Sequence, residues 1–145
     1  MVNSEKAKPT RLYWGIAVFS LIWNAFGCLD FTMTVVRYPA YMAAFPPEAV
    51  NWLDSAPTWT LVPWAIGVWG ALAGSVLLLL RSRSAVPAFA LSLAGLAVSL
   101  VWQAASGRPA SMTGPADMVM TVAIWIVALA LLGYALRMRA RGVLC

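Results

Sequence analysis

The chain has 145 residues, of which 62% are hydrophobic and only 10% are charged, and its formal net charge is +5. A soluble domain of this length needs a more polar surface, so the composition excludes an ordinary soluble fold and makes a lipid bilayer the expected surroundings. The basic residues flank long apolar runs, a pattern that indicates membrane orientation and not binding to nucleic acid.

Four apolar runs are long enough to cross the hydrocarbon of a bilayer, which takes about 20 helical residues. We expect spans at about 13–35, 58–80, 86–105 and 118–136, in a single membrane domain that covers residues 1–145. The predicted fold class is an all-α membrane protein, a bundle of four transmembrane helices.

The first span carries an acid, Asp30, about two-thirds of the way along it. A charged side chain near the middle of a bilayer costs roughly 2.5–3.5 kcal/mol, unless water, a partner or protonation relieves it. Two interpretations are open: a carboxylate that binds a proton, a cation or a substrate, or an acid that reaches the interface or pairs with Arg37. Arg37 lies two helical turns further on, so pairing requires the helix to end or bend between them.

The link after the first span is the only loop of substance. Pro46 and Pro47 precede residues 48–53, a sequence that predicts one or two helical turns with proline at the start. Tryptophan and tyrosine are enriched where membrane meets water, so we expect a short interfacial helix on the outer side. Whether this loop anchors the protein or acts as a lid over a pocket is left open.

Small and polar residues recur at helical spacing on the first three spans, where they let helices approach closely or hydrogen-bond to one another. Asn24, near the bilayer centre, is expected to bond to a neighbouring helix. Pro63 is expected to bend the second span near Trp59. The residues predicted to pack helices together are Asn24, Gly27, Gly67, Gly70, Gly74, Ser92, Gly95 and Ser99.

Polar and aromatic groups on all four spans fall at a similar depth, in the outer half of the bilayer. If the helices are rotated suitably, these groups line one outward-facing pocket, the default form of a ligand site. The sequence does not determine the rotations, so a ligand pocket and a coincidence of depth are both open. The candidate ligand-binding residues are Asp30, Trp59, Trp102, Gln103 and Thr121.

Orientation follows from the basic residues. The N-terminal tail, the link at residues 81–83 and the C-terminal tail hold every Lys and Arg except Arg37 and Arg108. The positive-inside rule therefore predicts that both termini and the 81–83 link lie in the cytoplasm. The alternative of a cleaved lipoprotein signal ending at Cys28 is disfavoured because the apolar run continues beyond it.

Several segments resemble small four-helix inner-membrane proteins of proteobacteria. They are residues 21–27 (LIWNAFG), Pro57-Thr58-Trp59 and residues 65–68 (AIGV), and the likeness extends over nearly the whole chain. Members of that group are mostly uncharacterised, and some are loosely labelled sugar transporters. The resemblance implies a multi-pass protein of the bacterial inner membrane with an uncleaved first span, and it implies no catalytic residues.

Metal and cofactor chemistry is not expected. The chain has no histidine, and its two cysteines, Cys28 and Cys145, are far apart in the predicted topology, so they build neither a zinc site nor a disulfide framework. No nucleophile, base and orienting group converge in the sequence, so we do not expect an enzyme.

Two functional classes are open. The first is a non-catalytic accessory subunit, assembly factor or lipid- or ligand-binding module, whose partners are the bilayer and a larger membrane complex or a second copy of the chain. The alternative is a homo-oligomeric small-solute or proton-coupled transporter that uses Asp30. Carriers usually contain paired repeats, which this chain lacks, so transport requires dimers of opposite orientation. The strong charge bias disfavours insertion both ways round.

Overall fold

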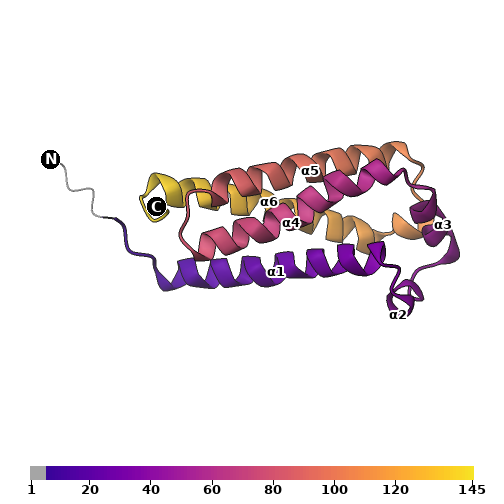
Figure 1. Cartoon of the computed structure of the whole chain (residues 1–145), viewed down its shortest axis with the longest axis horizontal. Helices are drawn as coiled ribbons and strands as arrows, with labels where there is room; N and C mark the ends of the chain where they lie inside the picture. Colours follow the sequence, from indigo (N-terminus) through magenta and orange to yellow (C-terminus); the bar gives the residue numbers. More distant parts are fainter. Residues whose placement is uncertain (1–5) are drawn as a thin grey trace.

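The structure is a computed structural model, and it describes residues 6–145 of the chain (Figure 1). The described residues form helices and no strand. In chain order the elements are α1 (Arg11–Val35), α2 (Pro39–Met42), α3 (Pro47–Ser55), the 3-10 turn η1 (Thr58–Thr60), α4 (Leu61–Leu79), α5 (Ala85–Ala105), the 3-10 turn η2 (Ala110–Met112) and α6 (Pro115–Ala140).

Four helical segments are long and apolar enough to cross a membrane: α1, η1 together with α4, α5 and α6. The predicted all-α class with four membrane-length helices is therefore confirmed. α6 is longer than the expected 118–136 because both of its ends are stabilised. Pro115 is preset for a first turn, the Asp117 carboxylate accepts a hydrogen bond from the Gly114 N–H at 3.2 Å, and Arg137 and Arg139 lie at the negative end of the helix dipole.

The four long helices run side by side, with α2 and α3 together at one end (Figure 1). We call this the loop end. The opposite end, which we call the terminal end, holds Ala7, the 81–83 link and residues 143–145, which are joined there by hydrogen bonds.

α4 and α5 are in backbone contact. A Cβ atom on Gly95 would lie 2.5 Å from the Pro63 carbonyl oxygen and 2.8 Å from the Gly67 nitrogen, so no larger residue fits there. The Ser92 hydroxyl donates a hydrogen bond to the Gly67 carbonyl at 2.5 Å. Small residues allow this approach, and it matters in a membrane because packing and hydrogen bonds replace the hydrophobic effect between helices.

The same seam continues toward the terminal end. A Cβ on Gly70 would lie 3.3 Å from Ser92, and one on Gly74 would lie 2.7 Å from the Phe89 ring, which covers this glycine. Ser99 continues the α5 stripe toward the loop end, and its buried hydroxyl has no hydrogen-bond partner among the described residues.

α1 packs on the other side of α4. The Asn24 amide donates to the Ser75 hydroxyl at 2.8 Å and to the Ala71 carbonyl at 3.3 Å, and Gly27 lies against Val68. Asn24 thus makes the interhelical bond expected of it. α4 is the helix that both of its neighbours contact through small or polar residues.

Pro63 does not bend a helix interior. It is the third residue of α4, within the first turn, where backbone N–H groups have no partner inside the helix. The chain enters α4 through the 3-10 turn η1, which contains Trp59, so the helix geometry changes just before Pro63.

The apolar core lies at the terminal end. Going from the loop end, α6 has no buried residue before Leu131. The bundle is consequently tighter at the terminal end than at the loop end. The buried cluster consists of Tyr13, Ala17, Leu78, Ala85, Val86, Phe89, Leu131, Ala135, Met138, Val143 and Leu144.

Arg81 joins three separate segments at the terminal end. It adopts a left-handed conformation, with φ of 57°, just after α4, and this reverses the chain toward α5. Its guanidinium donates to the Val143 carbonyl at 3.1 Å and to the Ala7 carbonyl at 3.4 Å. Its own carbonyl accepts the Cys145 N–H at 2.7 Å, and the Arg83 N–H donates to the Cys145 carbonyl at 3.0 Å. The 143–145 segment is thereby fixed against the 81–83 link.

Replacing Gly95 with alanine is expected to destabilise the bundle by about 1–3 kcal/mol, because backbone atoms of α4 occupy the space of the new methyl group. Gly133→Ala is the matched control, since nothing lies within 4 Å of a Cβ at that helical glycine. That control should be neutral or stabilise by up to about 1 kcal/mol. Unfolding midpoints in mild detergent provide the measurement, and equal midpoints for both variants would contradict the backbone contact.

Candidate functional site

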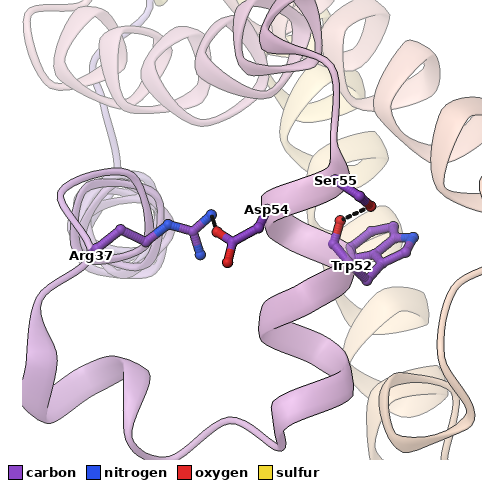
Figure 2. A network of polar contacts seen from close by, with 4 residues as sticks. All are labelled: Arg37, Trp52, Asp54 and Ser55. Carbon is purple, nitrogen blue, oxygen red and sulfur yellow. Dashed lines mark hydrogen bonds and ion pairs between the residues drawn. The ribbon is translucent and has the colours of Figure 1, made fainter.

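Two pairs of side chains tie the loop end of α1 to the segments that follow it. Asp30 is exposed, and its carboxylate accepts a hydrogen bond from the Tyr41 hydroxyl on α2. Arg37 lies beyond the end of α1 in a left-handed conformation, and its guanidinium pairs with Asp54 of α3 at 2.5 Å (Figure 2). Arg37 is therefore the partner of Asp54, and the pairing of Arg37 with Asp30 considered from the sequence is wrong.

The Tyr41 phenol is held in its neutral form. Burial raises the pKa of Tyr41 to about 12, and the hydrogen bond to Asp30 and the negative charge of Asp30 add to the effect. A neutral phenol can donate a hydrogen bond to the carboxylate at any physiological pH. Ordinary changes of pH therefore do not ionise Tyr41, the residue that donates the hydrogen bond between α2 and α1.

Trp52 ties α3 to the end of α5. Its indole N–H donates to the carbonyl and hydroxyl oxygens of Ser106 at 3.3 and 3.2 Å, and its ring centroid lies 5.0 Å from that of Trp102. Figure 2 shows Trp52 and Asp54 on the same helix, with Arg37 approaching from the end of α1. The loop between α1 and α4 is therefore fastened to α1 on one side and to α5 on the other.

Two adjoining depressions, with volumes of about 360 and 470 Å³, lie on the seam between α4 and α5. They share Trp59 and Val98, and we call them together the α4–α5 groove. The groove extends along α5 from Ala105 to Leu91, which is about 21 Å at the helical rise of 1.5 Å per residue. Its lining at the loop end consists of Trp59, Ala97, Val98, Val101, Trp102 and Ala105.

The groove is apolar along its whole length and open to its surroundings. Its floor on α5 includes the small residues Ala94 and Ala97, and no charged or hydrogen-bonding side chain lines it apart from the two indoles. Such a surface accepts a hydrocarbon chain or the face of another helix, and it offers nothing for a polar solute.

The structure brings together two of the five predicted ligand-binding residues. Trp59 and Trp102 line the α4–α5 groove, whereas Asp30, Gln103 and Thr121 line neither of its two depressions. The carboxylate of Asp30 is bonded to α2 instead, and the Thr121 hydroxyl donates to the backbone of its own helix.

The sequence reasoning missed the rest of the groove because it followed polar residues. The missed residues are Val62, Pro63 and Ile66 at the start of α4 and apolar residues on one face of α5, whose spacing of three or four residues was the available signal. On a membrane helix the same spacing is typical of any surface that faces lipid.

Among residues 6–145, no three His, Cys, Asp or Glu side chains gather closely enough to hold a metal ion. No protein-family model, curated protein or solved structure matches the chain. The groove and the polar contacts around it are therefore the features of the molecule that bear on its function.

Asp30→Asn is expected to lower the pKa of Tyr41 from about 12, because the charge and the hydrogen bond that favour the neutral phenol are weakened while burial remains. The stability contributed by neutral Tyr41 is present below pH 10 and is lost as the pH rises toward 12. Tyrosinate absorbance, measured as a difference against Tyr41→Phe, follows this titration. Asp117→Asn is the control, and an equal pKa in both variants would contradict the pairing.

Proposed function

We propose that this chain is a non-catalytic integral membrane protein that binds an apolar partner along the α4–α5 groove. In this role it is a lipid-binding module or an accessory or assembly subunit of a larger membrane complex. The observation that carries the proposal is the groove itself, which is about 21 Å long, wholly apolar and open along the bundle surface.

The shape of the groove supports binding in a bilayer. Lipid tails are as apolar as the groove, so affinity depends on close packing and not on the hydrophobic effect. The small side chains of the floor permit close approach, and the rings of Trp59 and Trp102 supply broad contact surfaces beside it. Because Trp102 packs on Trp52 of α3, one of these rings is held in place before a partner arrives.

The proposed setting is the bacterial inner membrane, with both termini in the cytoplasm. Every basic residue except Arg37 and Arg108 belongs to the tails or to the 81–83 link, and the positive-inside rule assigns that charge to the cytoplasmic side. On this assignment the loop end faces outward, and α3 lies at the outer interface of the membrane.

Val98→Trp is expected to abolish retention of the partner, because Val98 lines both depressions and a tryptophan there fills them. Val122→Trp is the matched control, since Val122 is a similarly exposed valine on α6 that does not line the groove. Native mass spectra of the protein purified in mild detergent compare the species retained by the two variants. Equal retention by both variants would contradict binding in the groove.

Transport is the second candidate, in the form of a homo-oligomer that couples solute movement to Asp30. The observation that favours it is an exposed acid on a candidate membrane span. A coupled carrier should lose flux in Asp30→Asn while its expression is maintained, whereas a binding module should keep its partner. Proteoliposome flux measured beside native mass spectra separates the two functions.

A further inference from the structure

Arg108 is an unpaired cation at the loop end. Its Nε atom is buried and has no hydrogen-bond partner, and its guanidinium forms no ion pair with any residue from 6 to 145. A buried donor without a partner is unfavourable, so a ligand that supplies an acceptor is favoured.

The acids of the loop end do not neutralise Arg108. Asp54 pairs with Arg37, Asp30 accepts the Tyr41 hydroxyl and Asp117 accepts the Gly114 N–H. Glu48 is exposed on α3 and lies within 4 Å of no basic group among the described residues. The positive charge of Arg108, a half-buried residue, is therefore uncompensated among residues 6–145.

Arg108 also lies close to the α4–α5 groove along the chain. The groove ends at Ala105, the last residue of α5, and Gly107 turns the chain there with φ of 67°. Three residues span at most about 11 Å even when fully extended, so the backbone of Arg108 is within that distance of the groove's end.

From this combination we propose that the occupant of the groove is an anionic phospholipid. One acyl chain lies along the groove and the phosphate is bound by Arg108 at the loop end. This proposal rests on the proposed function, and it adds the chemical class of the partner and the residue that selects it.

The dimensions fit a lipid of one leaflet. The hydrocarbon of a bilayer is about 30 Å thick, so one leaflet is about 15 Å deep. A groove of about 21 Å that begins at the helix end takes an acyl chain of that depth. Arginine suits the headgroup because its planar fork forms two parallel hydrogen bonds to phosphate oxygens.

In the test, the full chain in mild detergent is mixed with equal amounts of phosphatidylglycerol and diacylglycerol, both with the same acyl chains. The wild-type protein should retain phosphatidylglycerol in native mass spectra with a preference of about fivefold, the effect of one basic residue near an anionic headgroup. Arg108→Gln should bind both lipids without preference. Val98→Trp should retain neither lipid.

Arg139→Gln is the control for general attraction between basic residues and anionic lipid, since Arg139 is exposed at the terminal end. It should keep the full preference. Circular dichroism and size-exclusion profiles establish that each variant is folded.

The outcomes separate the two proposals. A preference that survives in Arg108→Gln, or is lost in Arg139→Gln, overturns the role of Arg108 and leaves binding in the groove intact. Retention of both lipids by Val98→Trp overturns the proposed function. If the wild-type protein retains a membrane protein and no lipid, and Val98→Trp loses it, the occupant is a helix and the lipid proposal fails.

Discussion

The backbone contact between α4 and α5 is the constraint on which the rest of the bundle depends. Between membrane helices the surrounding lipid provides no hydrophobic driving force, so association requires surfaces that pack closely. Gly95 meets Pro63 and Gly67 at distances that only glycine permits. With this pair fixed, α4 presents Ser75 to Asn24 of α1 on its other side, and α5 is positioned beside α6.

The two ends of the bundle are stabilised by different means. At the terminal end, a buried apolar cluster is closed by hydrogen bonds that radiate from Arg81 to segments far apart in the sequence. At the loop end, few side chains are buried, and α3 is held by its ion pair with Arg37 and by the hydrogen bond from Trp52 to Ser106 at the end of α5. The groove runs along the α4–α5 seam, and Gly95 and Pro63 of the backbone contact are among its lining residues.

Periodicity and composition predicted the helices well because crossing a bilayer imposes a length and an apolar character on each one. They also indicated which glycines and polar residues lie between helices, since Asn24 and Gly95 do so in the structure. The partners of Asp30 and Arg37 were not predictable, because they depend on the path of the chain after the left-handed residue Arg37, through α2 and on to α3. The groove was missed because the exposed face of α5 has the same apolar composition and spacing as a helix face that contacts only lipid.

The packing of Trp52 on Trp102 places α3 at the tip of the groove, while the length of the groove stays open along the side of the bundle. On the proposed function, an occupant therefore exchanges sideways, within the plane of the bilayer. Occupancy of such a groove follows the mole fraction of the occupant among the surrounding lipids and is independent of its concentration in water.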